Sequence, residues 1–260
     1  MPVSLTHGLK SIAIMYHDVV DLDRDPASGF PGFAADRYKL GRDEFSRHMA
    51  AIHAAIGGSS VILTFDDGGS SAYDPVAGVL EHFGWRGYFF ISTDWIGRPG
   101  FLTEAQIREL DRRGHILGSH SCSHPTIMSR VPLSEMSREW KASTDRLAEI
   151  VGHPVRVASV PGGYSSLAVV QTAADAGIET IFTSEPTTVI RMVGACRVHG
   201  RFVVRRGMGS EWSAGFAAGK FAPRFRQALA WRAKGLAKAV GGGSLYLRAQ
   251  EAIFNRLSSR

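Results

Sequence analysis

Short apolar runs that alternate with amphipathic segments limit the fold of this chain more than any other feature. Runs of strand length, rich in β-branched and aromatic residues, occur at residues 11–16, 61–65, 88–92, 115–120, 155–160, 180–183 and 201–206. Apolar residues at helical spacing occur at residues 40–56, 75–83, 103–113, 133–151 and 167–176. The connections are long enough for parallel crossovers, and this alternation predicts an α/β sheet or barrel. The polar segment 22–40 is predicted to be a long loop.

The length and composition of the chain are those of a globular protein with a sizeable core. The chain has 260 residues, of which 44% are hydrophobic, which suits one α/β domain or a domain with an appendage. No apolar run approaches the roughly 18 residues of a membrane span, and the first residues lack a signal-peptide pattern. Two cysteines, Cys122 and Cys196, give no disulfide framework. We therefore expect a cytoplasmic protein.

Positive charge is concentrated at the end of the chain. Residues 197–260 contain 13 Lys and Arg against two acids, whereas residues 1–196 contain 17 against 22, so the formal charges are +11 and −5. We predict a barrel over residues 1–210 and a basic amphipathic helical tail over residues 211–260. Apolar stripes run through the tail at Phe221, Phe225, Leu229, Leu236 and Val240, and again at Tyr246, Ala249, Ile253 and Leu257. Two interpretations stay open, contact with an anionic membrane surface or packing on the barrel, while nucleic-acid binding is the weaker third.

Polar residues follow several of the predicted strands. The run Val61 to Phe65 ends in Asp66 and Asp67, and His17, His120 and Tyr164 follow three other runs. In parallel α/β folds such residues gather at one edge of the sheet, where sites form. Two adjacent carboxylates seldom help folding unless they are paired or bind a metal, so they indicate a site. The simpler alternative is a polar turn in which Asp66 caps a helix.

His120 and His124 stand four residues apart. If the backbone turns helically after His120, both imidazoles face the same side. Two histidines and one carboxylate form a familiar three-ligand set for Zn²⁺, although a polar loop with one hydrogen-bonded histidine is the simpler alternative. Cys122 would point away from such a site and is interpreted as structural.

Two motifs in this order resemble a known family. Thr64-Phe65-Asp66-Asp67-Gly68 followed by His120-Ser121-Cys122-Ser123-His124 is similar to the first two motifs of the polysaccharide deacetylases, the NodB-homology enzymes of carbohydrate esterase family four. The resemblance covers roughly residues 10–190. It implies a distorted (β/α) barrel with fewer than eight repeats, here followed by C-terminal helices, and metal-dependent removal of acetyl groups from sugars, most often N-acetylglucosamine units.

The resemblance also implies roles for individual residues. Asp67, His120 and His124 match the metal ligands, with Zn²⁺ expected and Co²⁺ or Ni²⁺ as alternatives, and Asp66 matches the general base. The run Met15-Tyr16-His17-Asp18 resembles the opening of a permuted branch in which the acid-bearing strand comes first. His17 is therefore predicted to be the general acid, the alternative being a histidine that merely caps a strand.

The third family motif is incomplete. Ser159 stands where the family has the arginine that steadies the base. Another cation, Arg205 or Arg206, could replace it, or the base is tuned differently, or activity is weak. The proline and the turn that follow are present and are predicted to bind substrate, at Pro161, Gly162, Gly163 and Tyr164. Three roles stay open for Tyr164. Its ring contacts the sugar, its backbone N–H donates to the oxyanion, or the ring simply packs at a turn.

The predicted function is removal of N-acetyl groups from an amino-sugar unit of a polysaccharide or of its lipid- or nucleotide-linked precursor. The expected partner is a glycan or glycolipid, met in the cytoplasm or at the inner membrane face. One alternative is a non-hydrolytic, metal-containing carbohydrate-binding or scaffold protein of the same fold, suggested by Ser159. A second alternative keeps the hydrolytic chemistry and acts on a non-sugar amide.

Overall fold

A nine-stranded sheet forms the centre of the protein in the computed structural model, which describes residues 9–22, 28–57 and 60–233. The strand order is β11-β1-β4-β5-β6-β7-β8-β10-β9, and every neighbouring pair is parallel except β9 and β10. The strands are β1 (Ala13–Tyr16), β4 (Ile62–Phe65), β5 (Tyr88–Ile91), β6 (Ile116–Ser119), β7 (Val157–Ser159), β8 (Thr180–Phe182), β9 (Arg191–Val193), β10 (Cys196–His199) and β11 (Phe202–Val203). A second, two-stranded sheet joins β2 (Val19–Val20) and β3 (Leu40–Gly41).

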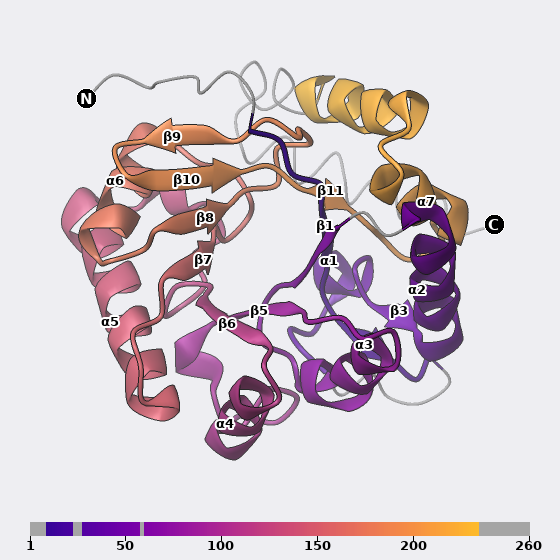
Figure 1. Cartoon of the computed structure of the whole chain (residues 1–260). Coiled ribbons are helices and arrows are strands. Elements are labelled where there is room, and N and C mark those ends of the chain that lie inside the picture. The colour runs from indigo at the N-terminus through magenta and orange to yellow at the C-terminus, as the bar shows by residue number, and fades with distance from the viewer. Residues whose placement is uncertain (1–8, 23–27, 58–59, 234–260) are drawn as a thin grey trace.

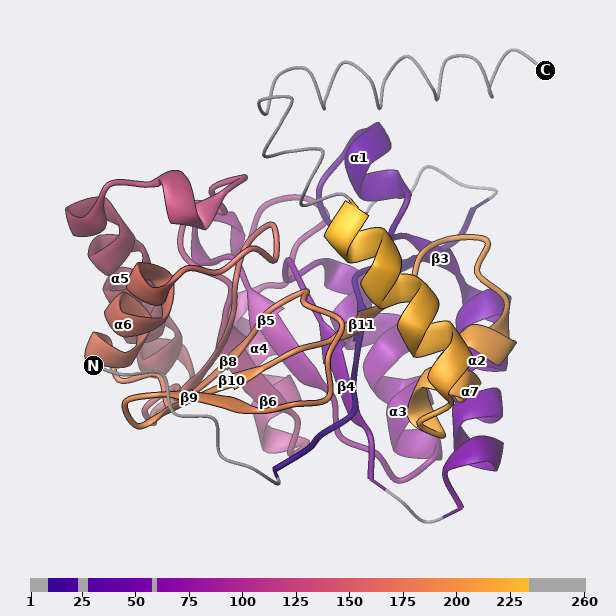
Figure 2. The ribbon, with the colours of Figure 1, turned by 90° about the horizontal axis from the view of Figure 1, so that it is seen from above.

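Helices cover the outer face of the curled sheet (Figure 1). They are α2 (Arg42–Ile56), α3 (Gly78–His82), α4 (Glu104–Arg112), α5 (Leu133–Val151), α6 (Leu167–Asp175) and α7 (Ser210–Ala217), and residues 221–233 are also helical. The short helix α1 (Phe33–Asp36) buries no residue and lies at one end of the barrel (Figure 2). Shorter turns lie at Ser70–Ala72, Tyr73–Ala77, Thr93–Trp95 and Met128–Arg130. Helix α4 begins at the expected capping box, in which Thr103 and Gln106 bond each other's backbone N–H.

The sheet is curled until its two ends come close together. β11 is the first strand in this order and β10 is the last but one, yet only Gly200 and Arg201 separate them in the chain. Three residue steps span at most roughly 11 Å, so the ends must approach one another across the open side of the barrel. This places Arg201 in the gap between the first and last parallel strands.

The predicted α/β barrel with fewer than eight repeats is confirmed, and every predicted strand is present with shifted bounds. The expectation that the segment 22–40 is a loop was wrong in part, because it contains α1 and the start of β3. The strands β2, β3, β9 and β10 were not predicted.

Helix α7 packs against α2 and β1, so it covers the barrel wall. The division of the chain at residue 210 stays a prediction. The second apolar stripe of the tail, from Tyr246 to Leu257, lies outside the described residues. Among the residues that the structure describes, none of the helices has the length and apolar character needed to cross a bilayer.

Candidate active site

Asp66 and Asp67 follow β4 directly and are both buried. The backbone of Asp67 is left-handed, with φ of 77°, and this breaks the strand alternation that would send the two carboxylates to opposite faces. Gly68 follows with φ of 84°, where a β-carbon would lie only 3.1 Å from the Ile91 side chain. The Asp-Asp-Gly order therefore places two acids on one side at a crowded strand end.

His120 follows β6, and the loop after it brings His124 back to the same place. The helical turn considered as a condition does not form, because Ser121 and His124 have left-handed backbones with φ of 63° and 61°. The buried carboxylate of Glu139, on α5, fixes this loop: it accepts bonds from Cys122 N, Ser123 N and Ser123 Oγ at 2.8–2.9 Å. A tether from a neighbouring helix thus replaces the helical turn.

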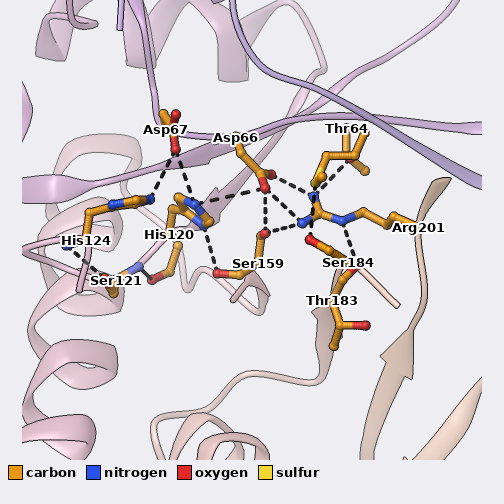
Figure 3. Close-up of polar contacts among 12 residues, drawn as sticks. Thr64, Asp66, Asp67, His120, Ser121, His124, Ser159, Thr183, Ser184 and Arg201 are labelled. Carbon is orange, nitrogen blue, oxygen red and sulfur yellow. Dashed lines mark hydrogen bonds and ion pairs between the residues drawn. The ribbon is translucent and has the colours of Figure 1, made fainter. Parts of the chain in front are cut away.

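The three predicted ligands meet around one point (Figure 3). Asp67 Oδ1 lies 3.4 Å from His120 Nε2 and 3.3 Å from His124 Nε2, and among the described residues these three form a group able to bind a metal ion. Ligand bonds of about 2.0–2.1 Å in a tetrahedral site put neighbouring ligand atoms roughly 3.3 Å apart, so the spacing fits a small divalent cation.

The protonation of His120 also suits a ligand. Its Nδ1 lies 2.9 Å from the carbonyl oxygen of Ser159, which can only accept, so Nδ1 carries the hydrogen. Nε2 is then the atom that faces Asp67, and its lone pair becomes available to a metal when Nε2 carries no hydrogen. A second-shell carbonyl of this kind orients ligating histidines in metal sites.

Electrostatics keep the Asp67 carboxylate ionised. Burial acts to raise its pKa, but hydrogen bonds with His120 and His124 outweigh burial and keep the pKa well below its usual value. For His124, burial acts to lower the pKa, and the Asp67 carboxylate reverses the sign, so the pKa is raised. A cation that binds here therefore competes with a proton for His124.

Arg201 forms a bidentate ion pair with Asp66 (Figure 3). Nη1 donates to Oδ1 at 2.7 Å and Nη2 donates to Oδ2 at 2.8 Å, and Arg201 is 0% exposed. Its remaining donors reach Thr64 Oγ1, Ser159 Oγ and the Thr183 carbonyl, so all five N–H groups are satisfied. Burial raises the pKa of Asp66, but Arg201 outweighs it, and the pKa lies below its ordinary value.

The replacement for the missing arginine is therefore Arg201, and the suggestion of Arg205 or Arg206 was wrong. Arg206 donates to the Lys39 carbonyl, and Arg205 lies over the Tyr38 ring. Ser159 still participates, because its hydroxyl accepts from Arg201 and donates to Asp66 Oδ2 at 3.1 Å. A small residue at position 159 leaves room for a guanidinium that arrives from the other side of the barrel.

His17 lies at the end of β1 and stacks on Tyr38, with ring centroids 4.5 Å apart. Its Nδ1 is buried and has no hydrogen-bond partner among the described residues. Tyr16 pairs with Phe65 in the parallel β1 and β4 strands, and Asp66 N donates to the Tyr16 carbonyl at 3.1 Å, so residues 17 and 66 lie side by side at the strand ends. The predicted acid is thus at the same site as the predicted base.

The turn Pro161 to Tyr164 follows β7 at the same edge. Gly162 and Gly163 have φ of 67° and 76°, and a β-carbon on Gly163 would lie 1.9 Å from Ser184 Oγ, so this turn needs glycine. The Tyr164 ring stacks on Trp231 at 4.5 Å, so part of its role is packing, while contact with a sugar stays a prediction. Cys122 is buried, its Sγ donates to the Glu139 carbonyl, and it lies outside the ligand group.

Two residues of the site were missed in the sequence. Arg201 belongs to no motif, and its only signal is a charge at the start of an apolar run. Glu139 had a clearer signal, because it lies on the buried face of α5 between Met136 and Trp140, where an acid needs a partner.

Comparison with known proteins shows which family this chain resembles. Residues 54–181 match the family model for polysaccharide deacetylase. YxkH of Bacillus subtilis, whose name assigns it provisionally to the polysaccharide deacetylases, is 29% identical over 156 residues, which are 59% of this chain and 55% of that protein. The peptidoglycan-N-acetylmuramic acid deacetylase PdaA of Bacillus subtilis is 27% identical over 127 residues, 48% of this chain and 46% of that protein. The chain thus spans about half the length of the curated relatives it matches.

Solved structures share the fold at low identity. A polysaccharide deacetylase from Bacillus cereus has a TM-score of 0.65 at 18% identity, covering 80% of this chain and 69% of that one. IcaB from Ammonifex degensii has a TM-score of 0.63 at 20% identity, covering 81% and 98%. The matched segment and the named relatives therefore make this chain similar to the polysaccharide deacetylases, and the solved structures share its fold.

Proposed function

We propose that this protein is a metal-dependent hydrolase that removes N-acetyl groups from an amino-sugar unit of a polysaccharide or of its precursor. The observation that carries the proposal is the pairing of Asp66 with Arg201 beside the three ligand atoms. Asp66 Oδ2 lies 4.0 Å from His120 Nε2, so an ionised carboxylate adjoins the metal position without being part of the ligand group.

The residues divide the reaction between them. Asp67, His120 and His124 would bind a divalent cation, which polarises an acetyl carbonyl and lowers the pKa of a bound water. Asp66 accepts the proton of the attacking water, and the two bonds from Arg201 fix its orientation and keep it ionised. The carbon–nitrogen bond then breaks to give acetate and an amine, and His17 donates the proton that the departing nitrogen needs. Zn²⁺ suits this set best, with Co²⁺ and Ni²⁺ as alternatives.

The non-hydrolytic alternative loses the observation that favoured it. Ser159 suggested a base without support, but Arg201 pairs with Asp66 from the connection between β10 and β11. The substrate class within the glycans is proposed from the expected location of the chain: a lipid- or nucleotide-linked precursor, met in the cytoplasm or at the inner membrane face.

The test is acetate release from N-acetylglucosamine oligomers by the full chain. Activity should disappear with a chelator and return on addition of Zn²⁺. Asp66→Asn should lower kcat by roughly 10²–10⁴, the usual contribution of a general base, while Zn²⁺ still binds. If metal-loaded protein releases no acetate from any N-acetylhexosamine substrate, the proposed activity is wrong.

A further inference from the structure

Helix 221–233 lies against the open edge of the barrel, beyond β11 (Figures 1 and 2). Its inner face is fixed at three points spaced four residues apart. Pro223 contacts the position of Gly215 in α7, Gln227 bonds both backbone groups of Val203, and Trp231 stacks on Tyr164. These contacts determine which face of the helix is turned away from the protein.

The outward face is apolar. Phe221, Phe225 and Leu229, also spaced four residues apart, are 73%, 53% and 59% exposed, and the two phenylalanine rings stack at 5.3 Å. Burial of three such side chains in a nonpolar medium is strongly favourable, and monomeric proteins rarely leave a continuous stripe of this kind in water. The stripe therefore fits a surface that the helix contacts.

The charges beside the stripe indicate which surface. Lys220, Arg226 and Arg232 are exposed, and no ion pair involves them among the described residues. Residues 212–250 contain seven Lys and Arg and no Asp or Glu, so the chain that continues from this helix adds positive charge. Apolar side chains on one helix face with cations beside them and no acids are typical of helices that lie in the interface of an anionic bilayer.

The helix also determines how the site would face that bilayer. It runs from α7 toward the edge of the barrel where α1 lies (Figure 2), and Trp231 contacts the turn after β7 that carries Pro161 to Tyr164. The end of the helix therefore touches the loop layer around the candidate active site.

We propose that the stripe Phe221, Phe225 and Leu229, with its flanking cations, docks this protein on an anionic phospholipid surface beside the mouth of the site. The docking stands on the helix alone. The substrate class that it implies, an N-acetylated sugar attached to a membrane lipid, rests on the proposed deacetylase function.

Sedimentation of the full chain with vesicles tests the docking. The wild type should sediment with phosphatidylcholine–phosphatidylglycerol vesicles and remain in solution with phosphatidylcholine alone. The triple variant Phe221→Ser, Phe225→Ser and Leu229→Ser should bind roughly tenfold or more weakly. The matched control, Leu133→Ser with Leu167→Ser, changes leucines that are 62% and 45% exposed on other helices and should bind like the wild type.

Three outcomes would overturn the docking. The wild type fails to bind anionic vesicles, which would indicate that residues 234–260 or a second copy covers the stripe. The second is that the triple variant binds the vesicles as tightly as the wild type. The third is that only removal of the charges at Lys220, Arg226 and Arg232 weakens binding, which would indicate a polyanion site without insertion of the apolar side chains.

Acetate release from a soluble N-acetylglucosamine oligomer, measured on the same samples, separates the two proposals. The triple variant should keep the wild-type rate, because none of its three positions belongs to the site. Vesicle binding without any acetate release would refute the deacetylase function and leave the docking intact.

Discussion

Replacement of Arg201 by methionine is the sharpest test of how the site works. Methionine keeps much of the side-chain volume and removes all five donors. Asp66 would then stay 5% exposed without its bidentate partner, and Ser159 and Thr64 would each lose a donor. Removing one partner of a buried ion pair costs roughly 3–5 kcal/mol of unfolding free energy.

The same change should alter catalysis in a defined direction. Burial raises the pKa of Asp66 and Arg201 opposes that effect, so its loss should raise the pKa of the base. The base must be ionised to accept a proton, so the acidic limb of the kcat/KM profile should move to higher pH. At neutral pH the loss in kcat/KM should not exceed the roughly 10²–10⁴ that a general base contributes.

The assay is acetate release as a function of pH, together with urea unfolding. Arg201→Lys keeps the charge and loses the bidentate geometry of the guanidinium, so its pH profile and its stability should lie between those of the wild type and Arg201→Met. This variant remains informative if Arg201→Met does not fold. Arg206→Met is the control, because Arg206 is exposed and donates to the Lys39 carbonyl rather than to Asp66. If Arg201→Met has the pH profile and the rate of the wild type, Asp66 is not the base or Arg201 does not keep it ionised.

Three further changes test other parts of the structure. Glu139→Gln should weaken Zn²⁺ binding roughly tenfold in calorimetry, because the tether of the histidine loop loses its charge; unchanged affinity would contradict this role. Gly69→Ala should lower the urea midpoint by the equivalent of roughly 1–3 kcal/mol, since its β-carbon would lie 1.9 Å from Asp18 Oδ1. Hydrogen bonds from Arg113 lower the pKa of Glu81 to about 2, so its contribution to stability is present above pH 4.5 and is lost as the pH falls toward 2. In Glu81→Gln the urea midpoint should depend less on pH over that range than it does in the wild type.

The sequence was sufficient for the parts of the molecule that local chemistry determines. Apolar periodicity located the strands of the large sheet other than β9 and β10, and it located helix α4 within the segment 103–113. The ligand set Asp67, His120 and His124 was also accessible, because residues at the ends of parallel strands share one edge. Local reasoning failed where tertiary contacts decide: the loop after His120 follows left-handed residues and the Glu139 tether instead of a helical turn.

Arg201 shows why the rest of the site could not be predicted. Arg201 lies 135 residues from Asp66 in sequence, and the approach of its guanidinium depends on β10 and β11 lying near opposite ends of one curled sheet. That arrangement follows from the closure of the barrel, which no local pattern encodes. His17 was predicted from its motif, and its place in the site also depends on the sheet, since β1 pairs with β4 and brings residue 17 beside residue 66.

The placement of these two residues has a consequence for how the domain is delimited. The family model matches residues 54–181, which contain the base and the ligands but neither His17 nor Arg201. A chain cut to those bounds would lose β1, β10 and β11 and with them the proposed acid and the partner of Asp66. Burial would then raise the pKa of Asp66 without opposition, so such a fragment could keep the metal ligands and still lack an ionised base. The catalytic unit therefore extends at least from β1 to β11, and closure of the barrel is itself a requirement of the proposed chemistry.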